Sequence, residues 1–536
     1  MDRLNSDTLK KKNLAAFYTP EAYAAKSAEL LKLAVKRVPR GWDYVIIDRC
    51  AGTGNLEKEL PEEILSHCIL STIDRDEYLI LKKRFFSRLR LLLPPSDALS
   101  REFIENPLIR SYIEDPHCSI ILYENPPYAE ANSIEHQKNS KSRTDFSNRD
   151  SFLIKEMKKE AGGSASNEIC NAFIWSGFKY YLRQDTDSYL LLAPVKYWKV
   201  QNLVNCKFLS GFGFNRRHFG TRVNAFIMAA LWANEPDTSD CICLKGYDIN
   251  KKGELAEPVE LKIFKIHSLY SSVYYDKRPF MDESYDGILT RLNGLEDSPG
   301  VKRRIQPLYS AHMLGYLVAD SAGFDNPDSK SSLLSAGRYN GNGFYLHDDN
   351  YLEKLPLFAA SRYTYYNRSW TEQGRIMKSA DGAENYFRDL KKGLLGQWLL
   401  KCLLFCCLDG QNHMRSFYGS DGRYYKNQLC LDGSNGKNSA LKDLESLEMG
   451  NDEKELIFRW QRVFSEASVC PGYDENLSYG VYQIRTELDS SQRLNNTKLI
   501  YDNSDLHGEL LNLKKALKAY YLKEIVPILF KYEFLK

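Results

Sequence analysis

The sequence lacks a hydrophobic run long enough to span a lipid bilayer. Its longest apolar stretch, Leu394 to Leu408, is interrupted by Gly396, Gln397 and Lys401. It is also shorter than the roughly 20 apolar residues that a membrane-spanning helix needs. Residues 1–12 show no secretory leader, in which a basic segment precedes an apolar one. We therefore expect a buried helix at Leu394–Leu408, a cytoplasmic location and no association with membranes.

Cysteine pairs at metal-ligand spacing are also lacking. The chain has 12 Cys, but no two of them form a CxxC pair. Three of them, Cys402, Cys406 and Cys407, fall in the apolar run without a nearby His. A structural zinc site needs a set of four Cys or His ligands. We therefore expect these thiols to pack in a core and to stay reduced in the cytosol, and we expect no metal.

No charge sign dominates the composition. Lys and Arg total 73 against 70 Asp and Glu, a net charge of +3, so any surface for nucleic acid has to be a local patch. Hydrophobic residues make up 43% and charged residues 27%, which is typical of a folded protein and excludes a disordered one. At 536 residues, the chain is long enough for two or three domains.

Residues 1–235 alternate short apolar strands with helical stretches. The predicted strands are Tyr44–Ile47, Cys68–Ile73, Ser119–Tyr123 and Ser188–Ala193, followed by an antiparallel edge hairpin of Phe212–Phe219 and Ala225–Trp232. Such alternation predicts a mostly parallel sheet with helices on both faces. We therefore expect an α/β domain over residues 1–235.

The alternation stops after residue 235. Residues 236–536 mix weak strands, loops rich in Gly, Asn and Ser, and helices, which predicts an α+β region of one or two subdomains. Aromatic and basic residues stand side by side there, most densely from Arg362 to Trp370. Within this cluster Arg362 and Arg368 suit contacts with guanine edges. The alternative is that the tyrosines are core residues and the arginines ordinary surface residues.

A glycine-containing loop follows the first predicted strand. It runs Asp48-Arg49-Cys50-Ala51-Gly52-Thr53-Gly54 and precedes a helical stretch. This is the place where an α/β sheet binds a nucleotide-like ligand, and glycines let the backbone turn sharply and approach that ligand closely. A purely structural turn would explain the same pattern.

Acidic residues follow the next two strands. Asp74, with Arg75 beside it, lies at the tip of the second strand, where a carboxylate accepts hydrogen bonds from ribose hydroxyls. Asp97 follows the third strand and is placed to accept a hydrogen bond from an adenine amino group. Ordinary surface carboxylates are the alternative for both positions.

The fourth strand runs directly into Glu124-Asn125-Pro126-Pro127-Tyr128. Two consecutive prolines hold the backbone in a rigid, extended exit from the strand. An aromatic amino nitrogen is a poor nucleophile, since its lone pair is delocalised into the ring. If the side-chain oxygen of Asn125 and the carbonyl of Pro126 each accept an amino hydrogen, that lone pair turns towards a methyl donor. Tyr128 is then placed to stack on a base that has left its duplex.

Together these motifs resemble the gamma class of amino-group DNA methyltransferases, the N6-adenine enzymes of bacterial restriction-modification and orphan systems. The resemblance covers about Phe17 to Asn234 and matches the family in the order and spacing of its motifs. It implies a Rossmann-like catalytic domain, the cosubstrate S-adenosylmethionine and a target-recognition region after residue 235. The donor contacts that it implies are Tyr18, Thr19, Pro20, Asp48, Cys50, Gly52, Gly54, Asp74, Arg75, Asp97 and Glu168. Upstream, Thr19 is also the predicted N-cap of a helix that begins at Pro20.

The resemblance further implies that Phe219 packs on the flipped base opposite Tyr128. The chain departs from the family at two positions, with Arg49 in place of Pro and Glu124 in place of a small residue. The sequence offers no physical account of Glu124. Between residues 129 and 166 lies a polar segment with basic residues that we expect to meet DNA phosphates, chiefly Lys138, Lys141 and Arg143.

The sequence thus predicts a site-specific DNA adenine-N6 methyltransferase that acts on double-stranded DNA. The motif of Asn125 suits any planar amino group, so methylation of RNA or of a protein amide is an alternative, although such enzymes are usually shorter and carry their extra domain before the catalytic one. A non-catalytic DNA-specificity subunit is another alternative, against which Asp48, Gly52 and Asn125 argue. A cognate restriction endonuclease encoded separately is a further partner that the sequence leaves open.

Overall fold

The computed structural model divides the chain into two compact units. Unit 1 comprises Met1–Lys265 and Ser369–Arg375, and unit 2 comprises Ile266–Arg368 and Ile376–Lys536. The structure describes residues 19–128, 151–161, 163–219, 225–275, 313–319, 331–334, 343–418, 424–432, 439–494 and 498–536. Four predicted site residues lie outside the described residues, namely Tyr18, Lys138, Lys141 and Arg143.

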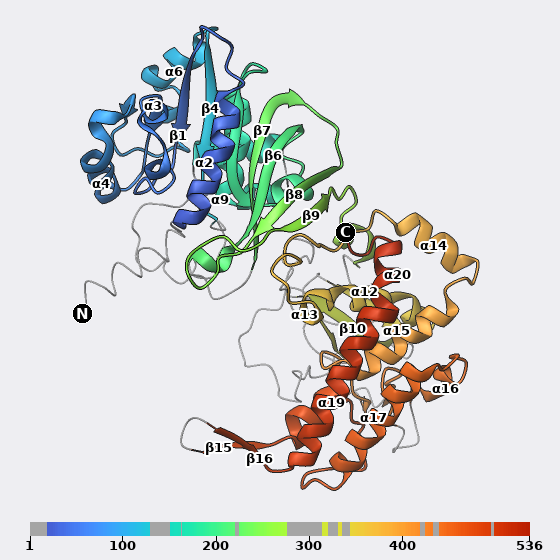
Figure 1. The fold of residues 1–536 in the computed structure, drawn as a ribbon. Helices are drawn as coiled ribbons and strands as arrows, with labels where there is room; N and C mark the ends of the chain where they lie inside the picture. The colour runs from blue at the N-terminus through green and yellow to red at the C-terminus, as the bar shows by residue number, and fades with distance from the viewer. Residues whose placement is uncertain are drawn as a thin grey trace. The chain divides into compact units, whose positions relative to one another are not determined.

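Unit 1 is built on a nine-stranded sheet with the order β3-β2-β1-β4-β5-β7-β6-β8-β9 (Figure 1). Its first five strands are parallel and comprise β1 (Asp43–Asp48), β2 (Cys68–Leu70), β3 (Leu91–Leu92), β4 (Cys118–Glu124) and β5 (Ser188–Pro194). All seven residues of β4 are buried, as expected of a central parallel strand that is covered on both faces. The predicted α/β class is confirmed.

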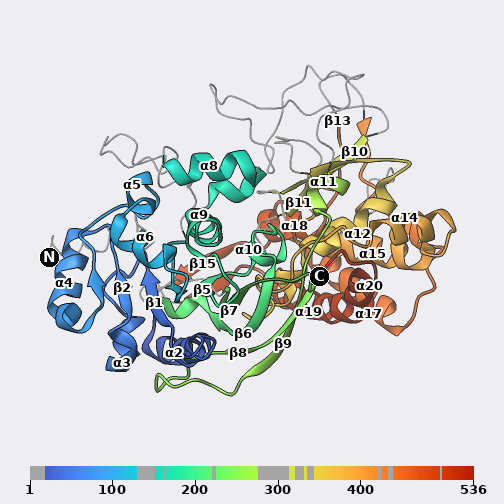
Figure 2. The ribbon, with the colours of Figure 1, turned by 90° about the horizontal axis from the view of Figure 1, so that it is seen from above.

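Helices cover both faces of this sheet. In the view of Figure 2, α2 (Glu21–Val35) and α3 (Glu62–Leu65) lie on one side of β1 and β2, and α8 (Phe152–Glu160) and α9 (Ile169–Ser176) lie on the other. The remaining helices and helical turns of the unit are η1 (Glu57–Glu59), α4 (Arg75–Phe85), η2 (Phe86–Arg88), α5 (Arg101–Ile104), α6 (Pro107–Glu114), η5 (Gly163–Asn167), η6 (Gly177–Tyr181), α10 (Lys196–Lys199) and η7 (Arg216–Phe219).

The part of the sheet beyond β5 is larger than the sequence suggested and contains both antiparallel and parallel strand pairs. The predicted hairpin is formed by β6 (Cys206–Asn215) and β7 (Phe226–Pro236), but β8 (Cys241–Tyr247) and β9 (Val259–Phe264) continue the sheet beyond it. The hairpin is therefore internal rather than an edge, and unit 1 extends to Lys265 instead of ending near residue 235. Polar residues alternate along β8 and β9 and leave one face of these strands exposed.

A short segment of the later chain also belongs to unit 1. Within residues 369–375, Trp370 stacks on Phe226 of β7 with ring centroids 6.1 Å apart, and the amide of Phe226 donates to the Gln373 carbonyl over 2.9 Å. The guanidinium of Arg375 donates to the Lys262 carbonyl of β9 over 3.2 Å. The catalytic half predicted from sequence is thus completed by residues far along the chain.

Unit 2 combines helices with small antiparallel sheets. Its helices and helical turns are α11 (Tyr270–Tyr274), α12 (Tyr351–Ser361), α13 (Tyr363–Tyr366), α14 (Ala383–Lys391), α15 (Gly396–Leu408), α16 (Leu441–Leu444), α17 (Asn451–Ser468), α18 (Val481–Gln483), η8 (Ile484–Leu488), α19 (Ser504–Tyr520), η9 (Tyr521–Ile525) and α20 (Val526–Lys531). Its strands are β10 (Met313–Ala319), β11 (Ser331–Leu334), β12 (Gly343–His347), β13 (Phe417–Tyr418), β14 (Tyr424–Tyr425), β15 (Ser491–Leu494) and β16 (Lys498–Tyr501).

The apolar run of the sequence forms the buried helix α15 at the centre of unit 2. Cys402, Cys406 and Cys407 all lie in the hydrophobic core that this helix shares with α12 and α19, so their predicted role in packing is confirmed. Among the residues that the structure describes, none of the helices combines the length and apolar character needed to cross a membrane.

Candidate active site

The candidate site lies where the strand order reverses. The chain enters the sheet at β1, builds β2 and β3 towards one edge, and then returns to place β4 on the other side of β1. In open α/β sheets a ligand binds at this switch point, outside the carboxyl ends of the strands. Asp48 ends β1 and Glu124 ends β4, so the glycine loop and the Asn-Pro-Pro-Tyr motif leave the sheet side by side at this edge.

The glycine loop has the backbone that its sequence demands. Gly52 and Gly54 have φ angles of 57° and 78°, in the left-handed region that favours glycine. A Cβ atom at Gly54 would lie 2.4 Å from the ring of Phe85, whereas one at Gly52 would meet only a Glu77 carboxylate oxygen at 3.9 Å. Gly54 is thus required for packing against α4, while Gly52 keeps the surface of the loop open.

Two buried carboxyl groups lie beneath this loop. The amide of Cys50 donates to Asp48 Oδ1 over 2.7 Å. Asp48 and Glu57 are each only 1% exposed. Burial raises the pKa of Glu57 to about 7 and, together with the neighbouring carboxylates of Glu57 and Glu124, raises the pKa of Asp48 well above its ordinary value. Burial thus disfavours the charged form of both carboxyl groups. No sequence motif marked Glu57, since its position relative to Asp48 depends on how the loop folds back.

The side chain of Asn125 is held at both ends. Its Nδ2 donates to Thr19 Oγ1 over 2.9 Å, and its Oδ1 accepts a hydrogen bond of 2.5 Å from the Tyr128 hydroxyl. The same hydroxyl lies 3.1 Å from the Leu192 carbonyl of β5. The amide is therefore fixed with its oxygen towards Tyr128, and that oxygen has a second lone pair that can accept one further hydrogen bond.

Thr19 differs in role from the sequence prediction. Helix α2 begins at Glu21, and its N-cap position is occupied by Pro20, which makes no side-chain capping bond. The hydroxyl of Thr19, which is only 6% exposed, instead accepts the hydrogen bond from Asn125. The prediction of a Thr19 N-cap is thus wrong, and Thr19 contacts the Asn-Pro-Pro-Tyr motif directly.

The two departures from the family pattern form one interaction. Arg49 and Glu124 have fully buried side chains and make a two-pronged ion pair, with Nε to Oε1 at 2.5 Å and Nη2 to Oε2 at 2.8 Å. Tyr189 of β5 donates to Glu124 Oε2 over 2.6 Å. Burial lowers the pKa of the Arg49 guanidinium, but the adjacent Glu124 carboxylate outweighs this effect and holds that pKa well above its ordinary value. Glu124, which had no physical account in the sequence, is the counterion of Arg49.

The other predicted donor contacts already carry local structural bonds. Asp74 caps α4, with Oδ1 accepting from the amides of Asp76 and Glu77 at 2.7 and 3.1 Å, and Arg75 is an exposed first residue of that helix. Asp97 Oδ1 accepts from the Leu99 amide over 2.9 Å. Glu168 precedes α9 and pairs with Lys196 Nζ at 3.0 Å. Asp74 and Asp97 lie after strands β2 and β3, whereas Glu168 follows the helical turn η5 and precedes α9.

Phe219 lies in the core on the side of α2. It is 7% exposed and stacks on Phe214 with ring centroids 5.5 Å apart, and Tyr128 packs against the same hydrophobic cluster. Arg216, three residues earlier in η7, interacts electrostatically with Tyr128, and burial lowers the pKa of its guanidinium. Sequence reasoning missed Arg216, although it stands in a basic pair with Arg217 beside the predicted Phe219.

In unit 2 the two predicted recognition arginines have different environments. Arg362 is 5% exposed, and its Nε lies 3.0 Å from Asp409 Oδ1 in the interior. Its guanidinium is committed to the core, so the predicted contact of Arg362 with a base edge is wrong. Arg368 is exposed and lies over the ring of Tyr365, 5.1 Å from its centroid.

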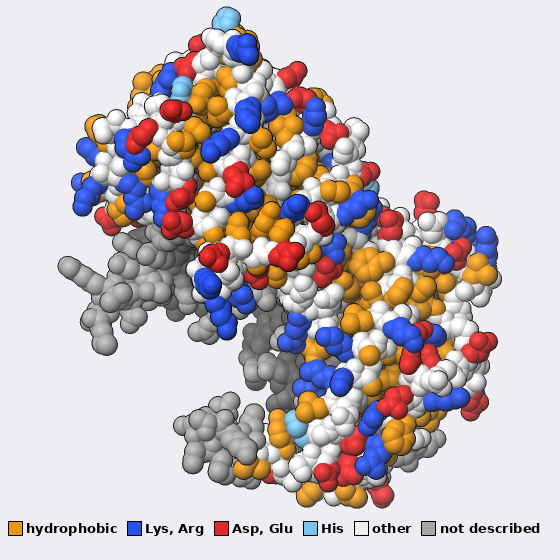
Figure 3. Space-filling view, in the orientation of Figure 1, with side chains coloured by type: hydrophobic (Ala, Val, Ile, Leu, Met, Phe, Trp, Pro, Cys, Tyr) orange, Lys and Arg blue, Asp and Glu red, His pale blue; other side chains and the backbone are white. Residues whose placement is uncertain are grey.

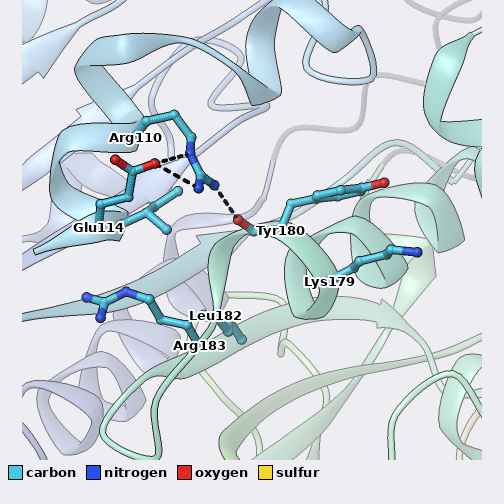
Figure 4. Close-up of a pocket in the computed structure, with 7 residues that line it drawn as sticks. Arg110, Glu114, Lys179, Tyr180, Leu182 and Arg183 are labelled. Carbon is cyan, nitrogen blue, oxygen red and sulfur yellow. Dashed lines mark hydrogen bonds and ion pairs between the residues drawn. The ribbon is translucent and has the colours of Figure 1, made fainter. Parts of the chain in front are cut away.

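A hollow of about 380 Å³ on unit 1 is distinct from the candidate site (Figure 4). Its cations are bound to the protein itself, with Arg110 donating to Glu114 Oε1 over 3.1 Å and to the Tyr180 carbonyl over 3.3 Å. It is lined by residues that precede β4 and β5, namely Arg110, Ile113, Glu114, Lys179, Tyr180, Leu182 and Arg183. The hollow therefore lies at the amino ends of the strands, opposite to Asp48 and Asn125.

No protein-family model matches the sequence, and no curated protein matches it. Among solved structures, similarity is found to a Listeria monocytogenes protein assigned to the class I S-adenosylmethionine-dependent methyltransferases, with 12% identity, 40% of this chain and 60% of that chain covered, and a TM-score of 0.25. The structure of a DrdV–DNA complex shows 13% identity, with 66% of this chain and 38% of that chain covered and a TM-score of 0.34. The glycopeptide N-methyltransferase MtfA complexed with S-adenosylmethionine shows 9% identity, with 44% of this chain and 76% of that chain covered and a TM-score of 0.17.

The aligned regions span 60% of the Listeria protein and 38% of the DrdV chain. At these identities and TM-scores the comparisons carry no functional argument. The Rossmann-like character of unit 1 is established by its own sheet order, with five parallel strands followed by the antiparallel β7. A proposal of function therefore depends on the geometry of the site.

Proposed function

We propose that the protein is a site-specific DNA methyltransferase that transfers a methyl group from S-adenosylmethionine to the N6 amino group of a flipped-out adenine. The observation that carries this proposal is the Asn125 side chain, fixed between Thr19 and Tyr128 at the tip of β4, beside the glycine loop at the tip of β1. This arrangement brings a loop suited to the methyl donor and an acceptor for amino hydrogens together at one switch point of the sheet.

The residues around the glycine loop fit S-adenosylmethionine. Gly52 leaves the loop surface open to a ligand, and the Asp74 carboxylate uses only its Oδ1 for the helix cap, which leaves Oδ2 for ribose hydroxyls. Asp48, Thr19 and Glu168 come from three elements that meet at the same carboxyl edge. When bound, S-adenosylmethionine supplies an electrophilic methyl group.

The Asn-Pro-Pro-Tyr motif supplies the groups that activate an adenine amino nitrogen. Asn125 Oδ1 and the Pro126 carbonyl accept the two amino hydrogens, and the lone pair is then directed out of the ring plane. As the N–C bond forms, the amino nitrogen becomes positively charged and strongly acidic, and one of its protons then passes to water, so no strong base is required. The hydroxyl of Tyr128 orients Asn125 Oδ1, and its ring stacks on the extruded base.

Recognition of the DNA sequence is proposed for unit 2, on a surface that excludes Arg362. Arg368 and Lys514 lie over the ring of Tyr365, with distances to its centroid of 5.1 and 5.7 Å. Figure 3 shows Lys and Arg side chains gathered over α19, along which Lys514, Lys515 and Lys518 are exposed. Cations around an aromatic ring suit both phosphate contacts and stacking on bases.

The test is the fate of a labelled methyl group. Purified full-length chain is incubated with methyl-labelled S-adenosylmethionine and, in separate reactions, with duplex DNA, RNA and a protein mixture. Nucleoside mass spectrometry is expected to find N6-methyladenine in the DNA reaction. Label only in RNA or protein would replace the proposed substrate, and donor binding without transfer to any acceptor would favour a non-catalytic specificity subunit.

A further inference from the structure

A buried ion pair lies at the base of the crevice between β1 and β4. Arg49 is the residue after Asp48, and Glu124 is the residue before Asn125. Their side chains are fully buried and meet through two hydrogen bonds of 2.5 and 2.8 Å. The pair therefore joins the donor loop to the acceptor motif directly.

The backbone ladder between the two strands ends before these tips. The register pairs Asp43 with Cys118 and continues to Ile47 with Leu122. Beyond that point the strands are linked by the side chain of Glu124, whose Oε1 also accepts the Arg49 amide over 3.2 Å. On its other side, β4 stays paired with β5 as far as Glu124 and Leu191. The ion pair thus replaces the missing ladder where the crevice opens.

The surrounding fold is shaped around the Arg49 guanidinium. Its Nη1 donates to Ser176 Oγ and its Nη2 to the Phe173 carbonyl of α9, both over 2.8 Å. The ring of Tyr181 lies 4.6 Å from the guanidinium carbon. A Cβ atom at Gly177 would lie 2.7 Å from the ring of Tyr189, which donates to Glu124, and 2.9 Å from Leu122 of β4, so glycine allows this close packing. The pair has defined partners on three elements.

We propose that the Arg49–Glu124 pair is a positioning device that sets the separation and orientation of the Asp48 and Asn125 tips for methyl transfer. This inference rests on the proposed function and names residues that touch neither reactant. Methyl transfer requires the nucleophile, methyl carbon and leaving sulfur in line, and misplacement by about 1 Å costs on the order of 100-fold in rate. A rigid link at the base of the crevice meets this requirement.

Stability and positioning are separated by replacing both charges at once. R49M or E124L alone leaves a buried charge without its partner, and a large fall in melting temperature is expected. The R49M/E124L double variant removes both charges, so we expect a melting temperature within a few degrees of the wild type. The matched control is R37M/E235L, which removes an ion pair of 2.9 Å involving β7 in the same unit.

The deciding measurement is single-turnover methylation by the full chain at saturating donor and DNA, with donor affinity from calorimetry. For R49M/E124L we expect a rate about 100-fold below wild type, donor affinity within about threefold, and an intermediate rate for R49K, which keeps the charge but loses the two-pronged geometry. The control is expected to keep the wild-type rate. A wild-type rate in the double variant would overturn the proposal.

A second readout does not require turnover. Crystal structures of the wild type and of R49M/E124L are expected to differ in the separation of the two tips and in the hydrogen bond between Tyr128 and Asn125. Identical tips would overturn the positioning role even if the methyl acceptor were not DNA. Conversely, a wild type that methylates no DNA, together with displaced tips in the variant, would contradict the proposed function alone.

Discussion

Two arginines, one in each unit, show how differently sequence and structure are related in the two halves of the chain. Arg49 in unit 1 and Arg362 in unit 2 are both buried, and each is paired with an acid, Glu124 or Asp409. Arg49 lies within a motif whose neighbours are fixed by the end of a strand. Arg362 lies in the aromatic and basic cluster from Arg362 to Trp370, which is defined only by its composition. Motifs tied to strand ends predict location, whereas aromatic and basic composition does not distinguish a surface from a core.

The largest effect is expected at the catalytic tip. Asn125→Ala removes an acceptor that acts mainly in the transition state, and turnover should fall roughly 1,000-fold, the scale found for losing one oriented transition-state group. Donor affinity should change little, because Asn125 lies on the acceptor side. Steady-state kinetics and calorimetry check both parts. Comparable turnover in the variant would remove Asn125 from the mechanism. It would also show that motifs at strand ends predict function no better than aromatic and basic composition does.

The comparison of arginines is sharpened within unit 2. Arg362→Met leaves Asp409 buried without its counterion, and unit 2 should lose about 3–5 kcal/mol of unfolding free energy. Arg368→Ala, at an exposed position, should change the unfolding free energy by about 0.5 kcal/mol or less. Denaturant titration measures both.

The exposed residue Arg368 should also contribute to DNA binding. Arg368→Ala is expected to weaken DNA binding and to reduce its salt dependence by about one unit of slope. An unchanged slope would place the recognition surface elsewhere on unit 2.

Glu57 gives unit 1 a pH dependence that its sequence conceals. Its ordinary pKa of 4.5 applies to the unfolded chain, and burial raises the folded value to about 7. Between these values the folded chain binds more protons than the unfolded one, so stability falls as pH rises through this window. Glu57→Gln removes the cost and should stabilise the protein by roughly 3 kcal/mol at pH 8 relative to wild type, with little difference at pH 4.

Unfolding measured at these two pH values checks the Glu57 prediction. Glu57→Asp is the matched control, because it keeps a buried carboxyl at the same position. An equal effect of Glu57→Gln at both pH values would show that packing, rather than ionisation, dominates there.

The two loop glycines should separate stability from ligand binding. Gly54→Ala brings a Cβ atom 2.4 Å from the Phe85 ring and should cost about 1–3 kcal/mol of stability. The Cβ atom of Gly52→Ala meets no close atom, so this variant should cost about 1 kcal/mol of stability through backbone strain. Gly52→Ala should nevertheless lower donor affinity more than Gly54→Ala does, although it destabilises the protein less. Melting temperatures and donor calorimetry on both variants test this, and the reverse order would contradict the assigned roles.

Among the changes at the candidate active site, the smallest effect on turnover is expected for Tyr128→Phe. Loss of the hydroxyl removes its hydrogen bonds to Asn125 and Leu192, at a cost of about 1 kcal/mol, but keeps the ring for stacking. Turnover should therefore change by less than about tenfold, since about 1.4 kcal/mol corresponds to one factor of ten. Tyr128→Ala should reduce turnover further by removing the stacking ring. Equal losses in the two variants would indicate that the hydroxyl itself has a chemical role.

The sequence predicted those parts of the fold and site that depend on neighbouring residues. The strands before Asp48 and Asn125 were found because apolar runs precede glycine and proline motifs. The bond from Asn125 to Thr19 and the pair of Arg49 with Glu124 join residues far apart in the chain, and no local pattern encodes them. The direction in which a side chain such as Arg362 points is set by tertiary packing.

The central claim is tested most directly by single-molecule sequencing of DNA from cells that express the wild-type chain or the Asn125→Ala variant. The wild type is expected to produce N6-methyladenine at one defined sequence, and the variant, present at the same level and still able to bind S-adenosylmethionine, should produce none. Unmodified adenines in both samples, or the same modified sites with the variant, would contradict the assignment of adenine methylation to this site.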